Sequence, residues 1–520
     1  MTKVCQVIIE GTVDDAVVSA KAARQRGADL VEFRLDFLKN PTLKDLRLLK
    51  KSIKGASIAT VRTKAQGGAF SDEASTKGAN NKGANNKGAN TKDPSKLHDL
   101  ILSAGFKYID IELPLSKRKM ETINKALKKK TIPILSAHNL RTGPTWRIGQ
   151  PLGILGIDAK TTKRCIIKEV FVASDANDWI NMQTLAAGPS KHIIIKNKQR
   201  RITLVTGRYS WPQRMFSGLF GSELCFSASL DECSLLGMPE TATLKAAFKS
   251  LKDLKAVPRD LYALVGADVS RSPSPDMFNS VFLKMRSDAA YLPYSMKPTD
   301  FYRFMKDPLS FGIAGGNITM PYKVSAMQHA GRTTRDCEKA GCANTFLSSG
   351  MYMHNSDVAA MRKMLEGRSG NALLLGTGGA AHAAAVALAE NMVGTYVWDR
   401  KQRNANGFAS NFGFETIRKI GSMHFDIVIN ATPLKARQEN AFYDRALKLV
   451  PMADLVIDTV YSSKPTAFLA AARTFKIQHR TGADMLLLQG RQSYKFLTGK
   501  DEPGLMTKAL KKRGLYATLH

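Results

Sequence analysis

The first half of the chain alternates short apolar runs of strand-like character with longer helix-like stretches. Eight such runs occur before residue 245, and segments such as "DDAVVSAKAARQRG" lie between most of them. Strands that alternate with helices are typical of a parallel sheet, and eight units predict a TIM-type (β/α)8 barrel. The expected strands cover residues 4–9, 30–36, 56–62, 108–113, 132–139, 165–173, 202–207 and 223–228.

Ionisable residues stand near the carboxyl ends of these expected strands, where the active sites of such barrels lie. One such residue alone is more often a stray charge or a structural ion pair. Several that converge on one mouth favour a site instead. The residues are Glu32, Arg34, Arg62, Glu112, His138 and, in the loop after the seventh strand, Arg214.

One lysine lies inside a strand that is otherwise apolar. Ile166, Lys168 and Val170 share a face under strand alternation, and a charged ammonium on that face is unfavourable unless it is paired or neutral. A neutral amine forms a Schiff base with a ketone, and the imine makes the neighbouring C–H acidic. We expect His138 to act as base and acid, Glu112 to orient its imidazole, and the arginines to bind a substrate carboxylate or hydroxyls. These groups allow imine-assisted dehydration or aldol-type cleavage.

The clearest local motif of the second half is a glycine turn between a strand and a helix, "ALLLGTGGAAHAAAVALAE" (372–390). Glycines here allow a tight turn and the close approach of a pyrophosphate to the helix N-terminus. Further strand-like runs at 395–400, 425–432 and 454–461 complete a Rossmann-like sheet.

The end of the second strand carries opposing signals for the cofactor. Arg400, Lys401 and Arg403 favour the 2′-phosphate of NADP, whereas Asp399 favours a free ribose hydroxyl. Nearer the start of this half, Ser272 and Ser274 bracket a proline, which turn chemistry alone would explain. Other polar residues are too far apart for a local motif, although folding can bring them together. These are Asn317, Thr319, Lys323, Asn344 and Asp357.

The formal net charge of +33 raises the alternative of a nucleic-acid-binding protein. The basic residues are dispersed over both halves without a zinc-finger or basic-aromatic motif, so a solvated surface that attracts anionic metabolites is favoured. The six cysteines lack the spacing of a metal site and are expected to be reduced and mostly buried, as in the cytoplasm. No apolar run is long enough for a membrane span, and no signal peptide is expected.

The stretches "GADLVEFRLD", "VRTKAQGG", "YIDIEL", "LSAHN" and "IIKEV" resemble the type I 3-dehydroquinate dehydratases in order and spacing, over most of residues 1–245. The resemblance implies that Lys168 is the Schiff-base lysine and that His138 with Glu112 is the acid/base pair. It implies substrate binding by Glu32, Arg34, Arg62, Arg214 and Ser234.

Two departures from that family concern substrate binding. Gln66-Gly67-Gly68 replaces the usual Glu-Gly-Gly, and Met238 stands where a glutamine is expected. Methionine cannot donate a hydrogen bond. A polar repeat, "KGANNKGANNKGANTK", follows and predicts a disordered insert at about 74–93. We expect dehydratase activity with weakened binding or an altered lid, and a disabled barrel is the alternative.

Residues 259–500 resemble shikimate dehydrogenase in "SRSPSP", "GGNITMPYK", "GCANT", "HNSD", "GTGGAA", "INATP", "IDTVY" and "GADMLLLQG". The resemblance implies that Ser272 and Ser274 bind the substrate carboxylate and that Lys323 with Asp357 handles the proton. It implies that the ring hydroxyls are bound by Asn317, Thr319, Asn344 and Gln489, with Tyr461 at the junction. The implied cofactor-binding residues are Gly376, Thr377, Gly378, Gly379, Ala380, Asp399, Arg400, Lys401, Thr432, Val460 and Gly482.

Two positions depart from the dehydrogenase pattern. Asp399-Arg400-Lys401 replaces the usual Asn-Arg-Thr, and His382 stands where an arginine is common. The implied substrate-binding domain covers 259–365 and 485–520, the Rossmann-like domain covers 366–484, and 246–258 is the linker from the barrel.

Together the two halves predict a bifunctional enzyme that needs no metal. The barrel would convert 3-dehydroquinate to 3-dehydroshikimate, and the second half would reduce that product to shikimate with NADPH. Membranes and specific nucleic acids are not expected as partners.

Overall fold

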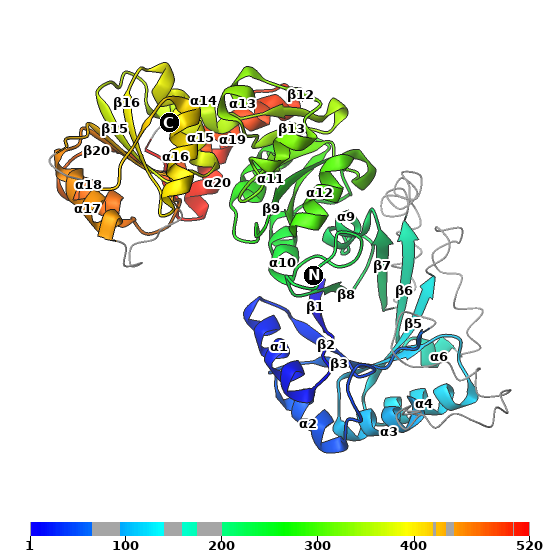
Figure 1. The fold of residues 1–520 in the computed structure, drawn as a ribbon. Coiled ribbons are helices and arrows are strands. Elements are labelled where there is room, and N and C mark those ends of the chain that lie inside the picture. Colours follow the sequence, from blue (N-terminus) through cyan, green and yellow to red (C-terminus); the bar gives the residue numbers. More distant parts are fainter. Residues whose placement is uncertain are drawn as a thin grey trace, which may run out of the picture. The chain divides into compact units, whose positions relative to one another are not determined.

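The computed structural model describes residues 2–64, 94–139, 159–173, 200–419, 423–432, 441–502 and 504–518. The chain forms two compact units, Met1–Val257 with Ser310–Gly312, and Pro258–Leu309 with Ile313–His520 (Figure 1). The expected insert at 74–93 and the turn at 66–68 lie outside the described residues.

The first unit is built on a single sheet of eight parallel strands, in the order β7-β6-β5-β4-β3-β2-β1-β8. All eight predicted strands are confirmed, with ends that differ by at most a few residues. The strands are β1 (Lys3–Ile8), β2 (Leu30–Arg34), β3 (Ser57–Thr60), β4 (Tyr108–Glu112), β5 (Ile132–Asn139), β6 (Ile166–Ala173), β7 (Arg201–Gly207) and β8 (Leu224–Ser227).

Helices follow the strands and bury the outer face of the sheet. The helices described are α1 (Val13–Gln25), α2 (Leu43–Lys51), α3 (Pro94–Ala104), α4 (Lys117–Lys128), α6 (Ala159–Thr162), α9 (Ser210–Met215) and α10 (Thr241–Ser250). Local sequence fixes their starts: Thr42 and Asp45 form a capping box at α2, and Ser116 caps α4. Outward residues of the strands, such as Phe33 and Ile109, pack into one core with the helices.

The barrel is nearly closed, because β7 and β8 lie side by side without forming a regular ladder. Side chains bridge this seam. Gln213 of α9 accepts a hydrogen bond from the Val205 N–H at 3.1 Å and donates to the Thr203 carbonyl at 3.0 Å. The Glu223 N–H donates to the Arg201 carbonyl at 2.9 Å. The amide of Gln213 thus satisfies backbone groups that a neighbouring strand would otherwise pair.

The segment expected to be a linker, 246–258, begins inside α10, which runs to Ser250. Helix α10 packs on β1 and α9, so the first residues of that segment belong to the barrel. The compact units divide between Val257 and Pro258.

The second unit holds two sheets. The first has the order β10-β9-β11-β13-β14-β12, with β10, β9 and β11 parallel and β13 antiparallel to both of its neighbours. Its strands are β9 (Asp260–Gly266), β10 (Ala289–Ser295), β11 (Gly315–Ile318), β12 (Arg332–Thr333), β13 (Thr345–Leu347) and β14 (Tyr352–His354). Its helices are α11 (Ser274–Lys284), α12 (Pro298–Lys306), α13 (Arg335–Ala340) and α14 (Ser356–Met364), with 3-10 turns at Pro308–Phe311, Ser325–His329 and Ser349–Met351.

The second sheet is fully parallel in the order β17-β16-β15-β18-β19-β20. This is the doubly wound order 3-2-1-4-5-6, whose ligand crevice opens between the first and fourth strands, here β15 and β18. The strands are β15 (Asn371–Leu375), β16 (Gly394–Trp398), β17 (Glu415–Thr416), β18 (Ile427–Asn430), β19 (Leu455–Asp458) and β20 (Gln478–Arg480). The Rossmann-like sheet is confirmed.

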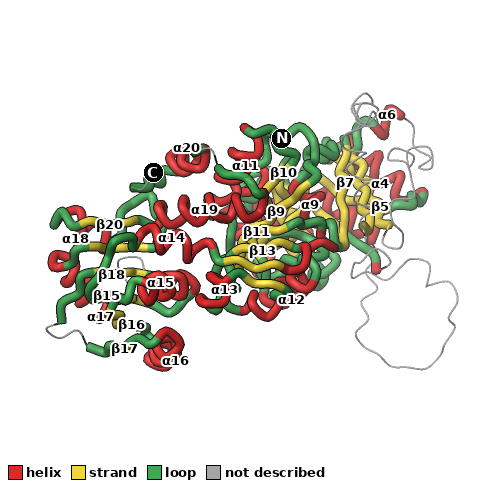
Figure 2. Tube along the Cα trace, turned by 90° about the horizontal axis from the view of Figure 1, so that it is seen from above, coloured by secondary structure: helices red, strands yellow, loops and turns green. Residues whose placement is uncertain are grey.

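Helices α15 (Gly379–Glu390), α16 (Gln402–Phe412), α17 (Ala441–Leu449) and α18 (Ala467–Thr474) belong to this sheet, with a 3-10 turn at Val450–Met452. Helices α19 (Gly482–Thr498) and α20 (Leu505–Lys512) return to the first sheet. Helix α19 packs against α14 and reaches β11 and β13 (Figure 2). The boundary expected at residue 485 therefore falls inside one continuous helix. None of the helices in the described ranges is long and apolar enough to cross a membrane.

Candidate active sites

The interior of the barrel is polar along β2 to β6 and apolar along β7, β8 and β1. The register places Ser136 beside Lys168, and Glu112 beside Ser136, on the inward face. Ile202 lies next to Lys168 on the other side. The alternation seen in the sequence therefore directs the polar residues of five strands into one chamber.

Lys168 is buried, with 3% of its surface exposed, but it is paired with carboxylates. Its Nζ lies 3.1 Å from Asp110 Oδ2 and 3.6 Å from Glu32 Oε1. It also lies 4.1 Å from the centre of the Phe226 ring, a cation–π distance. Lys168 therefore lies beside two carboxylates and the face of an aromatic ring, and its strand face is not purely apolar around it.

Asp110 is the most enclosed carboxylate of this chamber and is fully buried. Its Oδ1 accepts a hydrogen bond from Ser136 Oγ at 2.6 Å, and its Oδ2 lies 3.4 Å from Arg62 Nη2. Burial acts to raise the pKa of Asp110, but Lys168 and Arg62 outweigh it and hold that pKa well below its ordinary value. Asp110 is therefore an anion that accompanies the lysine.

His138 lies two residues beyond Ser136 on the same face of β5. Burial, with the nearby cations Arg62 and Lys168, lowers the pKa of His138 to about 2. The imidazole is therefore neutral near pH 7 in this chamber.

Glu112 accepts a hydrogen bond from the Thr63 N–H at 3.1 Å and lies 3.6 Å from Arg62 Nε. Burial raises its pKa, partly offset by Thr63 and Arg62. The expected orientation of His138 by Glu112 stays a prediction.

The three arginines predicted at the mouth have different surroundings. Arg34 makes a two-point ion pair with Asp36, at 2.9 and 2.7 Å, and Arg62 lies between Asp110 and Glu112. Arg214, in α9, is buried, and its Nη1 donates to the Phe226 carbonyl at 3.1 Å. Burial lowers the pKa of Arg214.

Ser234 and Met238 close a loop after β8. The Ser234 N–H donates to the Met238 carbonyl at 3.1 Å, and the Trp211 indole donates to the Ser234 carbonyl at 2.8 Å. One backbone bond and one bond from the Trp211 indole therefore hold this loop, and both are independent of the chemical identity of the Met238 side chain.

In the second unit, Lys323 and Asp357 form a short ion pair, with 2.5 Å between Nζ and Oδ2. Burial lowers the pKa of Lys323, but the carboxylate of Asp357 outweighs it and raises the pKa above its ordinary value. A side chain at Gly379 would clash with this lysine, because a Cβ there would lie 2.6 Å from Lys323 Cδ. The glycine turn therefore also gives the lysine its space.

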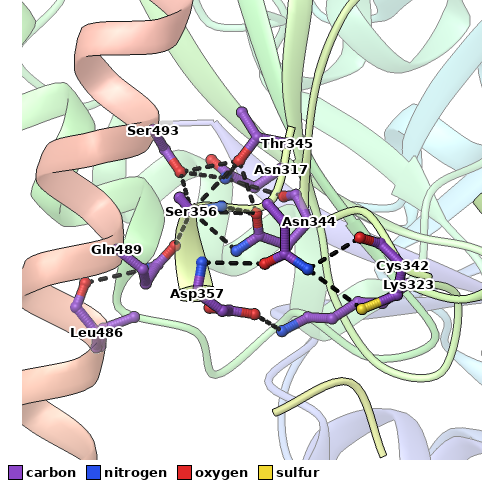
Figure 3. Close-up of polar contacts among 11 residues, drawn as sticks. Asn317, Lys323, Cys342, Asn344, Thr345, Ser356, Asp357, Leu486, Gln489 and Ser493 are labelled. Atoms are coloured by element: carbon purple, nitrogen blue, oxygen red, sulfur yellow. Dashed lines mark hydrogen bonds and ion pairs between the residues drawn. The ribbon is translucent and has the colours of Figure 1, made fainter. Parts of the chain in front are cut away.

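A network of uncharged groups lies beside this pair (Figure 3). Asn317 Nδ2 donates to Ser493 Oγ at 2.7 Å, and Asn344 Nδ2 donates to Ser356 Oγ at 2.9 Å. Ser493 Oγ lies 2.8 Å from Ser356 Oγ, and Ser356 Oγ donates to Gln489 Oε1 at 3.4 Å. The side-chain amides of Asn317, Asn344 and Gln489, which come from separate parts of the chain, are thus held in fixed orientations.

The lysine pair, the three amide side chains of this network and the glycine turn line one cavity of about 760 Å³. Every residue predicted for the dehydrogenase lines this cavity. On the substrate side these are Ser272, Ser274, Asn317, Thr319, Lys323, Asn344, Asp357, Tyr461 and Gln489. On the cofactor side they are Gly376, Thr377, Gly378, Gly379, Ala380, Asp399, Arg400, Lys401, Thr432, Val460 and Gly482.

The cofactor side fits a dinucleotide. Gly376 has φ +101°, and a Cβ there would lie 3.0 Å from the Ala431 carbonyl, so only glycine suits the turn. The N-terminus of α15 follows directly and offers free backbone N–H groups to a phosphate. Thr377 Oγ1 donates to Asp399 Oδ2 at 2.9 Å, and the Lys401 N–H donates to Oδ1 at 2.9 Å. His382 instead lies 2.6 Å from the Ala340 carbonyl.

Sequence reasoning missed several polar residues of both sites. Asp110 precedes Glu112 by two residues in β4, so strand alternation places both on one face and gives a signal that was available. Thr345, Ser356 and Ser493 are small polar residues from distant elements, and their spacing gives no such signal. In the described parts of the chain, no cluster of three or more His, Cys, Asp or Glu residues has the arrangement of a metal site.

Comparisons with known proteins agree with this division of the chain. The family model for type I 3-dehydroquinase matches residues 4–255, and that for the shikimate dehydrogenase substrate binding domain matches residues 264–346. The chloroplastic bifunctional 3-dehydroquinate dehydratase/shikimate dehydrogenase of Arabidopsis thaliana is 24% identical over 534 residues, covering 96% of this chain and 82% of that protein. The shikimate dehydrogenase (NADP(+)) of Oleidesulfovibrio alaskensis is 29% identical over 265 residues, covering 49% of this chain and 95% of that protein.

Among solved structures, the dehydroquinate dehydratase and shikimate dehydrogenase from S. pombe is 20% identical and covers 98% of both chains, with a TM-score of 0.40. On the family models and the relatives, the chain is a type I 3-dehydroquinase joined to a shikimate dehydrogenase, a bifunctional enzyme of the shikimate pathway.

Proposed function

We propose that the barrel dehydrates 3-dehydroquinate to 3-dehydroshikimate through a Schiff base on Lys168, and that the second unit reduces this product to shikimate with NADPH. The observation that carries the proposal is one lysine in each unit, buried in the barrel and partly buried in the second unit, each paired with an aspartate next to the groups that its chemistry needs.

In the barrel, the amine of Lys168 attacks the ketone. His138 is neutral, so it takes the proton from the carbon next to the imine and then gives it to the departing hydroxyl. Arg34, Arg62 and Arg214 supply the positive charge for the substrate carboxylate. Glu32 and Ser234 complete the proposed contacts.

In the dehydrogenase, the Lys323 ammonium donates its proton to the oxygen that becomes an alkoxide as the ketone is reduced. Asp357 keeps this lysine charged and points it into the cavity. Ser272 and Ser274 bind the carboxylate, while Asn317, Thr319, Asn344 and Gln489 bind ring hydroxyls. Tyr461 lines the junction between the substrate and cofactor sides.

NADPH, when bound, supplies the hydride. The glycine turn at 376–379 and the N-terminus of α15 would hold its pyrophosphate, and Arg400 with Lys401 would hold the 2′-phosphate. Several relatives are named as NADP(+) shikimate dehydrogenases, which supports this preference. Both carboxylate oxygens of Asp399 accept hydrogen bonds, one from Thr377 Oγ1 and one from the Lys401 N–H. These bonds offset part of the repulsion between the Asp399 carboxylate and the 2′-phosphate.

Two assays test the proposal. Borohydride added with 3-dehydroquinate is expected to leave a reduced adduct on Lys168, detected by peptide mass, and the Lys168→Ala variant is expected to leave none. NADPH fluorescence is expected to fall on addition of 3-dehydroshikimate, more strongly than NADH fluorescence. Dehydration without any adduct would contradict the covalent route.

We also propose a cytoplasmic location, because the six cysteines, all within the described ranges, are buried thiols that form no disulfide with one another, as in a reducing compartment. The substrates are small carboxylates, and the basic surface favours their encounter. Fluorescence microscopy of the tagged chain in its own cell tests the location, and an organellar signal would contradict it. Specific nucleic-acid binding is not expected, and salt-resistant retention of the chain on DNA would contradict that expectation.

A further inference from the structure

The buried carboxylate of Asp110 holds Lys168 and lies nearest to the reacting nitrogen, but the steps proposed above give it no role of its own. It is 3.1 Å from Lys168 Nζ, whereas Glu32 is 3.6 Å away and accepts a hydrogen bond from Thr60 Oγ1 at 2.6 Å. Ser136 Oγ and Arg62 Nη2 also face Asp110. The carboxylate is thus fixed as an anion against the lysine.

The proposed reaction keeps a positive charge on this nitrogen through most of its course. The ammonium gives up one proton to His138, and the neutral amine forms a C–N bond with the ketone carbon. That proton and a second one from nitrogen pass to the former carbonyl oxygen, which leaves as water. Ammonium and ketone thus become protonated imine and water, with no net change in charge.

We propose that Asp110 is the counter-ion that keeps the Schiff-base nitrogen protonated in the barrel. The proposal rests on the Schiff base of the proposed function and adds the residue that makes it effective. A protonated imine draws electrons from the neighbouring C–H bond far better than a neutral imine does. In a buried chamber, an iminium without an adjacent anion would lose its proton readily.

Several other charged or titratable groups face this pair from neighbouring strands. They are Cys5 of β1, Glu32 and Arg34 of β2, Arg62 after β3, Glu112 of β4 and His138 of β5. The inward residues of β7 and β8 next to the pair are apolar, namely Ile202, Leu204, Leu224 and Phe226. Of the carboxylates in the described part of the barrel, Asp110 lies closest to Lys168 Nζ and has no exposed surface.

The Asp110→Asn variant of the full chain tests the proposal. We expect dehydratase kcat to fall about 100-fold or more, with dehydrogenase activity unchanged. We also expect a change in the pH profile of the fraction that borohydride traps. The alkaline limb, where this fraction falls, should move to lower pH by about one unit or more, since the nitrogen has lost its nearest anion. A loss of packing alone would not move this limb.

Two further variants keep the test decisive. Asp29→Asn removes the carboxylate of another lysine pair in the barrel, 3.0 Å from Lys245 Nζ, and is expected to leave kcat and the limb unchanged. Ser136→Ala keeps the Asp110 charge but removes its hydrogen bond, and is expected to shift the limb in the same direction with a threefold to tenfold loss of kcat, an order-of-magnitude expectation of about 1 kcal/mol. This variant decides the matter if Asp110→Asn does not fold.

A folded Asp110→Asn variant with the wild-type limb and kcat would overturn the counter-ion role. If the wild-type chain itself forms no adduct while it dehydrates its substrate, the Schiff-base proposal fails instead, so the two failures are distinguishable.

Discussion

Each unit of this chain buries one lysine against one aspartate, and the two pairs are built for different tasks. Lys168 projects from the middle of a strand into a chamber with two carboxylates and an aromatic ring. Lys323 meets Asp357 at the start of a helix, beside amides and hydroxyls. Under the proposed function, the first environment serves a nitrogen that becomes covalently bound, and the second serves a nitrogen that only donates a proton.

Because the surroundings of the two lysines differ, burial of a lysine does not by itself indicate its chemistry. Near Lys168, charges of both signs are close together. Under the proposed function, this arrangement stabilises a nitrogen that is an ammonium before the reaction and a protonated imine during it. Near Lys323, the neighbouring amides and hydroxyls are uncharged, and under the proposed function they would position a polyhydroxylated ring. The neighbours of the pair decide the reaction.

The largest expected effect separates the two lysines. Lys168→Ala is expected to lower dehydratase kcat by about 10⁴-fold or more, because no other group can form the imine. Dehydrogenase activity of the same preparation should stay within a factor of about two, since additivity holds for independent sites. Steady-state assays of both reactions check this, with Lys323→Ala as the reciprocal control. If Lys168→Ala dehydrated its substrate at the wild-type rate, the covalent role proposed for Lys168 would be wrong.

The next effect concerns the partner of Lys323. Asp357→Asn is expected to lower dehydrogenase kcat by about 10²-fold, because the proton donor loses its orientation and charge support. The carboxylate raises the pKa of Lys323 against burial, so its removal lets burial dominate and lowers that pKa. The alkaline limb of the rate profile should therefore move to lower pH.

Asp300→Asn is the matched control for that measurement, since it removes a carboxylate 3.9 Å from Arg303 on α12 of the same unit. It should leave both kcat and the limb in place. An unmoved limb in Asp357→Asn would show that the ion pair does not govern the proton step.

The fold was largely accessible from the sequence, because strand alternation and glycine turns are local signals. The eight barrel strands and the crevice beside Gly376 follow from them. Strand alternation places Asp110 on the inward face, but it does not predict the contact between Asp110 and Lys168. The two residues lie on β4 and β6, which are not adjacent in the sheet. Cross-barrel distances depend on closure, which no local pattern encodes.

The neutral network of the dehydrogenase was hidden for a different reason. Thr345, Ser356 and Ser493 are separated by up to 148 residues, and none has a composition signal of its own. The resemblance to known dehydrogenases pointed to residues that line the cavity. It did not point to Ser493, which accepts a hydrogen bond from one of them, Asn317.

A smaller effect tests this supporting residue. Ser493→Ala removes an acceptor of Asn317 Nδ2, which still has the Asn344 carbonyl and Thr345 Oγ1 as partners. We expect KM for 3-dehydroshikimate to rise about tenfold with kcat little changed, since a hydrogen bond contributes about 1 kcal/mol. Ser493→Thr keeps the hydroxyl and is the control for loss of packing. An equal loss in kcat would instead assign Ser493 to the proton step.

The smallest effect is a gain in the barrel, at the position where a neutral donor is missing. Met238→Gln is expected to lower KM for 3-dehydroquinate about twofold to tenfold, because one new hydrogen bond contributes about 0.5–1.5 kcal/mol. The loop should survive, since its shape depends on the bond from the Ser234 N–H to the Met238 carbonyl. Met238→Leu keeps an apolar side chain of similar size and should leave KM unchanged. If glutamine binds substrate no better than leucine, this side chain does not reach the substrate, and the barrel relies on its charged residues alone.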